Sequence, residues 1–317
     1  MRPPKTSDPK SFDCLIIGGG PAGLTAAIYA ARFRLSTVVV DMGHSRAALI
    51  PCTRNHAGFP DGISGADLLD RMRQQALRWG AGLRRSRVEA LTGRAGGFAA
   101  RLADGERIMA RAIILATGVT NHRPDIPEDI HAEGLRRGLI RYCPVCDGFE
   151  VSDCNVAVVG DGERAVREAT FLRAYTERVT VFPTTSNAAF NSDEHGKLAS
   201  IGVRILIGPP RRFRLESGGL SLEAGGRRWL FDSLYPAMGS SVHSDLAARL
   251  GAELTDVGCI KVDAHQRSSV AGLYAAGDVV IGLDQISHAM GEAGVAATTL
   301  RNDLAAAKPI LRAMDAP

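Results

Sequence analysis

The chain has 317 residues, enough for two modest domains but not for three. Hydrophobic residues make up 45% and charged residues 23%, an ordinary globular composition, whereas glycine is in excess with 35 residues. Without a G-X-Y period or a low-complexity segment, this excess excludes collagen-like and disordered chains and favours the tight turns of nucleotide-binding α/β folds. The net charge of +4 is too small to indicate nucleic acid as a partner, and two arginine clusters, residues 84–87 and 211–214, are interpreted as solvated surface.

Cysteine usage and the apolar stretches predict a cytoplasmic protein. Six cysteines are too few for a disulfide scaffold. Residues 1–10, MRPPKTSDPK, are polar and lack the apolar stretch of a secretory signal. The uncharged stretch of membrane-spanning length, residues 14–31, contains Gly-Gly-Gly-Pro, which would interrupt a spanning helix.

The first part of the chain predicts a strand, a glycine-rich turn, a helix and a second strand. The first strand spans residues 12–17, the turn residues 18–23 and the second strand residues 37–40, and the helix runs to residue 32. Gly18, Gly20 and Gly23 fit the pattern G-x-G-x-x-G, whose glycines allow a tight turn, approach of the backbone to a pyrophosphate and close helix–strand packing. Asp41 follows the second strand, where a carboxylate can accept hydrogen bonds from ribose hydroxyls. The pattern predicts a dinucleotide-binding site but does not distinguish FAD from NAD. The alternative interpretation is a glycine-rich turn that binds no ligand.

The same plan recurs about 140 residues later. A strand is predicted at residues 155–159, a turn at 160–165, a helix that runs to residue 175, and a second strand at 178–182. Two such units predict an α/β fold with two Rossmann-like dinucleotide-binding domains.

The remaining segments predict how the two domains are connected. Residues 111–115 are an apolar strand, and the chain can leave the first sheet at residues 116–118 and return to it at residues 231–241. Residues 272–278 are a strand that leads into a glycine turn, and residues 287–304 are a last helix. We therefore expect a discontinuous first domain, residues 1–118 and 240–317, with a second domain, residues 119–239, inserted into it.

A C-x-x-C sequence, Cys143-Pro-Val-Cys146, is followed directly by Asp147. The spacing lets two thiols close a small disulfide, and a helix that began at Cys143 would lower a thiol pKa and favour thiol–disulfide exchange. Asp147 is a candidate proton donor and acceptor for this exchange. A zinc site, for which two further ligands are lacking, and a pair of inert buried cysteines are the alternatives. The isolated cysteines are interpreted as structural: Cys14, Cys52, Cys154 and Cys259.

Four motifs occur in a fixed order: the first glycine loop, Ala-Thr-Gly at 116–118, C-x-x-C-Asp, and Gly277-Asp278. In this order they resemble the low-molecular-weight thioredoxin reductase family, over nearly the whole chain. The resemblance implies FAD in the first domain, a pyridine-nucleotide domain inserted into it, and a redox disulfide in the inserted domain. It further implies that Cys146 faces the flavin, that Cys143 exchanges with the substrate and that Asp147 is the acid–base group.

The resemblance also implies how FAD is held and how the chain assembles. The expected FAD-binding residues are Gly18, Gly20, Ala22, Gly23, Asp41, Asn55, Thr117, Gly118, Gly277, Asp278, Gln285 and Ile286. Members are commonly homodimers, and the inserted domain is expected to rotate about connections near Gly118 and Gly239 so that a large substrate can reach the cysteines. His288, near the start of the last helix, is interpreted as structural.

The second glycine loop departs from the family pattern. It keeps its two glycines but carries Asp161 and Glu163, whose carboxylates are unfavourable beside a pyrophosphate. Members that use NADPH carry a His-Arg-Arg cluster after the next strand, whereas this chain has Phe-Pro-Thr-Thr at 182–185, with neither a base for the 2′-phosphate nor an acid for the ribose. We therefore expect inefficient use of NADPH; Arg164 is either a compensating charge or a surface residue.

Three functions remain open. We expect an FAD-dependent thiol–disulfide oxidoreductase that exchanges electrons between FAD and the Cys143–Cys146 disulfide. Its substrate would be a thioredoxin-like protein or a small dithiol or disulfide, and its electron partner ferredoxin, oxygen or a second flavin. A conventional NADPH-dependent thioredoxin-disulfide reductase is the alternative, and a non-enzymatic FAD-binding redox sensor is the third. No metal, nucleic acid or membrane is expected.

Overall fold

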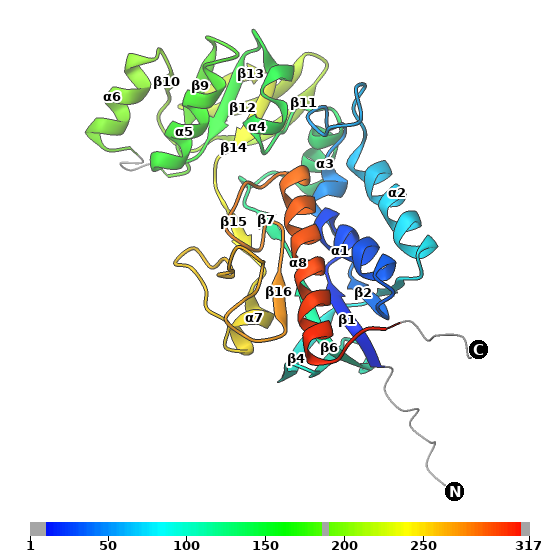
Figure 1. Ribbon diagram of the computed structural model, residues 1–317. Helices are drawn as coiled ribbons and strands as arrows, with labels where there is room; N and C mark the ends of the chain where they lie inside the picture. The colour runs from blue at the N-terminus through cyan, green and yellow to red at the C-terminus, as the bar shows by residue number, and fades with distance from the viewer. Residues whose placement is uncertain (1–10, 186–189, 312–317) are drawn as a thin grey trace, which may run out of the picture. The chain divides into compact units, whose positions relative to one another are not determined.

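The structure is a computed structural model that describes residues 11–185 and 190–311. The N-terminal segment used above to argue against a secretory signal lies outside these residues. The described chain forms two compact units (Figure 1): the first comprises residues 11–48, 66–119 and 242–311, and the second the remaining residues, 49–65 and 120–241. Residues 49–65 thus cluster with the second unit, although the division expected from sequence puts them in the first domain.

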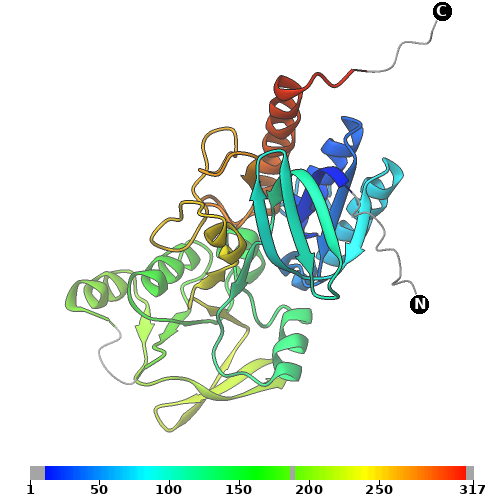
Figure 2. The same cartoon turned by 90° about the horizontal axis from the view of Figure 1, so that it is seen from below.

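The first unit is built on a seven-stranded sheet in the order β3-β2-β1-β6-β5-β4, with β16 also paired to β6. The strands are β1 (Ser11–Ile17), β2 (Thr37–Asp41), β3 (Gly82–Arg85), β4 (Val88–Arg94), β5 (Gly97–Leu102), β6 (Arg107–Leu115) and β16 (Leu273–Ala275). Five strands are parallel, and β5 and β4 extend β6 as an antiparallel edge (Figure 2). Residues 14–17 of β1 and 37–40 of β2 are buried, which explains the apolar sequences Cys-Leu-Ile-Ile and Val-Val-Val within these strands.

Two helices, α1 (Pro21–Arg32) and α8 (Ile286–Ala307), lie side by side on one face of this sheet (Figure 1). Their buried residues are mostly alanines: Ala22, Ala26, Ala27, Ala30, Ala31, Ala289, Ala293, Ala296 and Ala297. Such small side chains let the two backbones approach closely. A Cβ on Gly277 would touch Ala22 and Ala289, and one on Gly294 would touch Tyr29, so the two helices run in the same direction and begin at the same edge of the sheet.

The described residues of the first unit form three further helices. They are η1 (Arg46–Leu49), which ends at the unit boundary, α2 (Gly65–Arg78), which begins at it, and α7 (Asp245–Arg249). Across residues 11–185 and 190–311, no helix is both long and apolar enough to span a membrane, α8 with its 22 residues included.

The second unit repeats the parallel plan on a smaller scale. A four-stranded parallel sheet, in the order β10-β9-β8-β14, is accompanied by a three-stranded antiparallel sheet, β11-β12-β13. The strands are β8 (Val156–Val159), β9 (Val179–Phe182), β10 (Arg204–Ile205), β11 (Arg211–Glu216), β12 (Gly219–Ala224), β13 (Arg227–Phe231) and β14 (Ser233–Pro236). The helices are α3 (Glu128–Arg136), α4 (Pro144–Asp147), η2 (Phe149–Val151), α5 (Gly162–Leu172) and α6 (Ser192–Ser200). The α/β prediction with two Rossmann-like sheets is confirmed.

Two short strands connect the first unit with residues 120–241 of the second. β7 (Val119–Asn121) and β15 (Ser240–Val242) pair with each other as a two-stranded sheet. The residue before each strand is a glycine with a positive φ, +62° at Gly118 and +82° at Gly239. Other residues rarely adopt this conformation, so glycine is required where the chain turns into each connection.

Candidate functional site

The first glycine loop is packed so tightly that side chains do not fit. Gly18 has φ +106°, and a Cβ there would lie 2.2 Å from the Ala116 carbonyl oxygen. A Cβ on Gly23 would lie 1.8 Å from the carbonyl oxygen of Gly18. Gly20 is the N-cap of α1 and makes no side-chain cap. The first turn of α1 therefore keeps N–H groups that an anionic group such as a pyrophosphate can accept.

Asp41 is fixed at the end of β2 by backbone donors. Its Oδ1 accepts the Gly19 N–H at 3.0 Å, and its Oδ2 accepts the Gly43 N–H at 3.0 Å. A Cβ on Gly19 would lie 2.6 Å from the carboxylate carbon, so glycine is also required for this approach. Each carboxylate oxygen retains a lone pair for a ribose hydroxyl.

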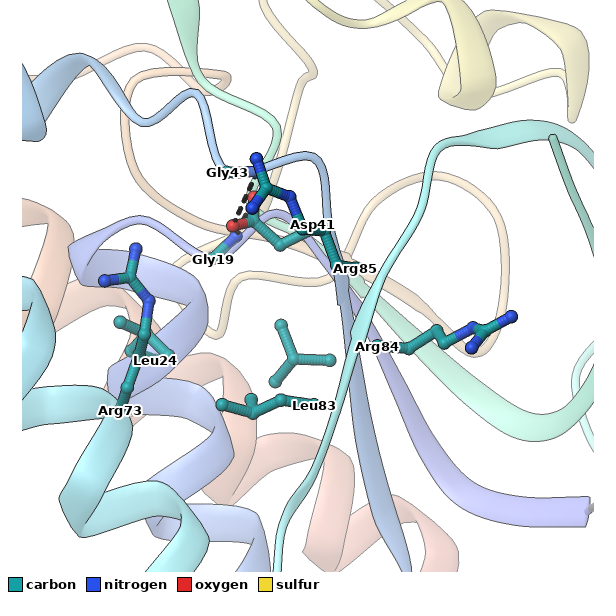
Figure 3. A pocket seen from close by; sticks show the side chains of 9 residues that line it. Gly19, Leu24, Asp41, Gly43, Arg73, Leu83, Arg84 and Arg85 are labelled. Atoms are coloured by element: carbon teal, nitrogen blue, oxygen red, sulfur yellow. Dashed lines mark hydrogen bonds between the residues drawn. The ribbon is translucent and has the colours of Figure 1, made fainter. Parts of the chain in front are cut away.

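A cavity of about 430 Å³ opens beside Asp41 (Figure 3). Its lining is Gly19, Leu24, Val39, Asp41, Gly43, Arg73, Leu83, Arg84 and Arg85. The volume is within the range of small-molecule sites. Arg84 pairs with Asp104 at 2.6 Å, whereas Arg73 and Arg85 form no ion pair with a described residue. Arg84 and Arg85 are exposed as expected, but their place in this lining was not predicted.

A second group of charges lies where β16 leads into α8. Gly277, with φ +79°, lies against the first turn of α1, where a Cβ would be 2.9 Å from Ala22 Cβ. Next to it, Asp278 accepts a hydrogen bond from Arg46 Nη2 at 2.6 Å, and the same nitrogen lies 3.3 Å from Asp284. Burial raises the pKa of Asp278, against the lowering effect of Arg46.

Glu292, which the sequence analysis missed, ties this turn to α8. It is only 9% exposed; its Oε2 accepts the Gly277 N–H at 2.7 Å, and its Oε1 lies 3.0 Å from His288 Nε2. Burial raises the pKa of Glu292. His288 therefore has a carboxylate partner. The signal that could have revealed the pair was a lone glutamate four residues after a histidine in a helix of small apolar residues.

The first unit contains the expected FAD-binding residues except Asn55. Thr117 is held beside the loop by its hydroxyl, which donates to the His243 carbonyl at 2.6 Å. Gln285 is the N-cap of α8, whose first turn begins at Ile286, and its side chain makes no capping hydrogen bond. The glycine cradle, the uncapped helix α1 and the fixed Asp41 fit the pyrophosphate and ribose of FAD.

Asn55 lies in the second unit, close to the cysteine pair. Its Nδ2 is 3.5 Å from the carbonyl oxygen of Val145, the residue between proline and Cys146, and its Oδ1 accepts the Thr53 hydroxyl at 2.9 Å. The structure thus brings Asn55 to the redox loop.

Cys143 and Cys146 form a disulfide, with their Cα atoms 5.2 Å apart. Cys143 is the N-cap of α4, and its Sγ accepts the Cys146 N–H at 3.1 Å. This donor would stabilise negative charge on the Cys143 sulfur after the disulfide opens. The other four cysteines form no disulfide, and burial raises the pKa of Cys14, Cys154 and Cys259.

The Asp147 carboxylate is held by two residues that the sequence analysis did not single out. Arg141 Nη1 donates to Oδ2 at 2.9 Å, and the Tyr235 hydroxyl donates to Oδ1 at 2.9 Å. Burial raises the pKa of Asp147, and both donors act in the opposite direction. Nothing in the local sequence marks Tyr235, because it is 88 residues away along the chain.

The second glycine loop keeps the backbone shape of a Rossmann loop, but the carboxylate of Asp161 within it is hydrogen-bonded to Thr184. Gly162 has φ +59°, and a Cβ on Gly160 would lie 2.5 Å from the Ala237 carbonyl oxygen. Asp161 Oδ1 accepts the Thr184 N–H at 2.8 Å, and Oδ2 accepts the Thr184 hydroxyl. This carboxylate therefore occupies the end of β9, where an NADPH-binding domain recognises the ribose and its 2′-phosphate.

Further groups around this loop leave little positive charge at the phosphate position. The Glu194 carboxylate of α6 faces Gly162, with Oε1 3.6 Å from the position of a Cβ. The Arg164 guanidinium lies against Gly239, with Nε 3.5 Å from the position of a Cβ. It also lowers the pKa of Glu168, so its charge is shared with a carboxyl on its own helix.

Known proteins match this chain over most of its length. Residues 12–293 match the pyridine nucleotide-disulphide oxidoreductase family. A thioredoxin reductase of Mycolicibacterium smegmatis is 34% identical over 282 residues, which are 84% of this chain and 88% of the relative. The structure of thioredoxin reductase from Streptococcus pyogenes MGAS5005 matches with a TM-score of 0.85 at 26% identity, covering 93% of this chain and 99% of that one. The atypical thioredoxin reductase TRi from Desulfovibrio vulgaris Hildenborough matches with a TM-score of 0.53 at 33% identity, covering 94% and 99%.

These matches extend across both units, and they support an enzyme rather than the non-enzymatic sensor. The chain therefore belongs to the pyridine nucleotide-disulphide oxidoreductase family, as a flavin disulfide oxidoreductase of its low-molecular-weight thioredoxin reductase-like group.

Proposed function

We propose that this enzyme exchanges electrons between FAD and the Cys143–Cys146 disulfide without efficient use of NADPH. FAD, when bound, supplies the two-electron donor or acceptor for the cysteine pair. In this proposal residues 1–118 and 240–317 form the FAD domain, with Asp41 at the ribose and the uncapped first turn of α1 at the pyrophosphate. Residues 119–239 form the inserted domain that carries the disulfide.

The residues of the chain account for the exchange itself. A substrate thiol attacks Cys143 Sγ, which forms a mixed disulfide and leaves the electron pair on Cys146. Asp147 accepts the proton that this attacking thiol loses. The second substrate sulfur, as a thiolate, attacks the substrate sulfur of the mixed disulfide, and Cys143 leaves as a thiolate that the Cys146 N–H stabilises. The reverse sequence reduces a substrate disulfide.

The observation that carries the NADPH part of the proposal is the Asp161–Thr184 pair. An incoming dinucleotide would have to displace both hydrogen bonds and place its phosphates beside a carboxylate. Without a base at 182–185, nothing there compensates for this cost. We therefore infer that electrons reach or leave the flavin through another partner, with ferredoxin, oxygen and a second flavin as the candidates.

The substrate side is proposed from the chemistry of the pair and from the relatives. A C-x-x-C disulfide exchanges with any accessible dithiol or disulfide of suitable potential, and the Mycolicibacterium smegmatis relative is a thioredoxin reductase. A thioredoxin-like protein or a small dithiol or disulfide is therefore the proposed substrate. We further propose that the enzyme is a cytoplasmic homodimer.

A conventional NADPH-dependent thioredoxin reductase is the second candidate. It is favoured by the identity of 34% to a thioredoxin reductase and by the retained shape of the second loop at Gly160 and Gly162. In this case the Asp161–Thr184 hydrogen bonds open when the nucleotide binds.

Anaerobic stopped-flow mixing of the oxidised holoenzyme with NADPH separates the two candidates. We expect the flavin absorbance to stay unchanged over the time in which dithiothreitol bleaches it. Rapid bleaching by NADPH would contradict the proposal and identify the conventional reductase. NADH and reduced ferredoxin, mixed in the same way, identify the partner.

A double variant, Asp161→Gly with Thr184→Arg, tests the structural reason. It removes the carboxylate and supplies a guanidinium for the 2′-phosphate, so NADPH should reduce the flavin ~10-fold faster than in the wild type. Asp193→Asn, an exposed carboxylate at the start of α6, is the matched control and should leave the rate unchanged. A double variant as unreactive as the wild type would show that Asp161 is not the obstacle.

A further inference from the structure

The hydrogen bonds around Asp147 point to a role for two residues outside the C-x-x-C-Asp motif. We propose that Arg141 and Tyr235 are positioning residues that hold the Asp147 carboxylate for proton transfer to and from the Cys143–Cys146 pair. The inference rests on the proposed exchange function, and it adds the residues that orient and tune its acid–base group.

The two carboxylate oxygens are held separately. Oδ2 accepts Arg141 Nη1, and Oδ1 accepts the Tyr235 hydroxyl, each at 2.9 Å. The same hydroxyl also lies 3.3 Å from the Asp147 carbonyl oxygen. Asp147 is the last residue of α4 and follows Cys146 directly, so the two donors fix the carboxylate of the residue that comes after the disulfide.

Both donors are themselves anchored to the sheet of the second unit. Tyr235 belongs to β14 and is fully buried in the core. The backbone N–H of Arg141 donates to Leu234, the residue before Tyr235, at 2.9 Å, and its Nε donates to the Gly138 carbonyl at 3.0 Å. The position of the carboxylate is therefore set by β14 as well as by the short helix α4.

The charges around Asp147 oppose one another. Burial raises the pKa of Asp147, and Glu150 of η2 adds to this effect. The Arg141 charge and the hydrogen bonds from Arg141 and Tyr235 lower it. Glu150 faces Arg54, whose Nη1 is 3.5 Å away, so part of its charge is balanced. Without the two donors, a carboxyl in this position would keep its proton to higher pH.

This balance suits a group that works in both directions. When a substrate thiol attacks Cys143, its proton must pass to an ionised Asp147. When the disulfide re-forms in the reverse sense, protonated Asp147 returns that proton to the departing substrate thiolate. A carboxyl held permanently protonated would serve only the second step, and Arg141 and Tyr235 keep the first step accessible.

The test is the pH profile of flavin reduction by dithiothreitol, measured anaerobically with the holoenzyme. Each rate is divided by that of an Asp147→Asn variant at the same pH. This division cancels the pH dependence that comes from the ionisation of the dithiothreitol thiols. In Arg141→Met and Tyr235→Phe, the limb assigned to Asp147 should move to higher pH, by ~1 unit in the arginine variant. Arg141→Lys restores the charge and should return the limb toward its wild-type position.

Arg136→Met is the matched control, because Arg136 is an exposed arginine of the same unit that pairs with Glu133. Its profile should equal that of the wild type. Variants that lower the rate equally at every pH, with the limb unmoved, would overturn the positioning role and leave the proposed function intact. Failure of dithiothreitol to reduce the wild-type flavin would overturn the proposed function, and the positioning role with it. Tyr235→Phe retains the buried ring, so it tests the hydroxyl without opening a cavity.

Discussion

Glu168, on α5, is a half-buried residue whose carboxyl oxygen Oε2 is buried and has no hydrogen-bond partner among residues 11–185 and 190–311. Burial raises its pKa from the ordinary value of 4.5 to about 7, although Arg164 and Arg167 act in the opposite direction. The folded chain therefore keeps a proton at pH values where the unfolded chain has released it. Because the unfolded state binds fewer protons between these two pKa values, stability falls as the pH rises from 4.5 to about 7.

Glu168→Gln should remove this pH dependence. At pH 8 the variant should be more stable than the wild type by up to ~3 kcal/mol, and at pH 4.5 the two should be nearly equal. Urea unfolding of the second unit, followed through Trp229 in a Trp79→Phe background, measures the difference. Glu163→Gln, an exposed glutamate on the same helix, is the control. Equal stability of Glu168→Gln and wild type at pH 8 would contradict the prediction.

The two helices that pack side by side in the first unit, α1 and α8, contain glycines with opposite requirements. A Cβ on Gly23 of α1 would lie 1.8 Å from the backbone oxygen of Gly18, which cannot move without disturbing the loop. A Cβ on Gly291 of α8 would meet nothing within 4 Å. Close packing therefore requires glycine at position 23, where α1 contacts the preceding loop, but not at position 291 of α8.

Alanine at these two positions should have effects of opposite sign. Gly23→Ala should destabilise the first unit by about 3 kcal/mol and release FAD, because the backbone must shift to accept the methyl group. Gly291→Ala should stabilise it by up to ~1 kcal/mol, because alanine has the better helix propensity. Thermal unfolding and FAD content after gel filtration measure both effects. Retention of FAD at wild-type affinity in Gly23→Ala would contradict the packing argument.

At the scale of the whole molecule, each unit has its own hydrophobic core. The first unit has a core on each face of its sheet, and β8, β9 and β14 of the second unit supply residues to two further clusters. The expected FAD contacts, apart from Asn55, lie in the first unit. A ligand stabilises the part of a protein that binds it, so the two units should respond differently to FAD.

FAD should therefore raise the stability of the first unit alone. At a free FAD concentration of 100 Kd, the gain is ~2.7 kcal/mol. Amide hydrogen exchange of the apoprotein and holoenzyme measures it strand by strand, with slower exchange expected in β1 and β2 and unchanged exchange in β8 and β9. An equal slowing in both units would contradict the assignment of FAD to the first unit.

Much of the fold followed from local patterns. The apolar runs of β1 and β8, the glycines after them and the periodic helices α1 and α5 each carry their signal within about 30 residues. The predicted segments differ from the observed ones mainly at their ends; for example, the helix predicted to residue 175 ends at Leu172. The sequence left open whether a helix begins at Cys143, and the structure shows a short helix that begins directly after that residue.

The sequence by itself determined the order of strands, glycine turns and helices, the family, and the cysteine pair, because each of these depends on residues that are neighbours along the chain. Only the tertiary structure decided the partners: Tyr235 on Asp147, Glu292 on Gly277, and Thr184 on Asp161. It also brought Arg73 and Arg85 to one cavity with Asp41. These partners come from different elements, and no local pattern encodes which side chains will meet when sheets and helices pack together.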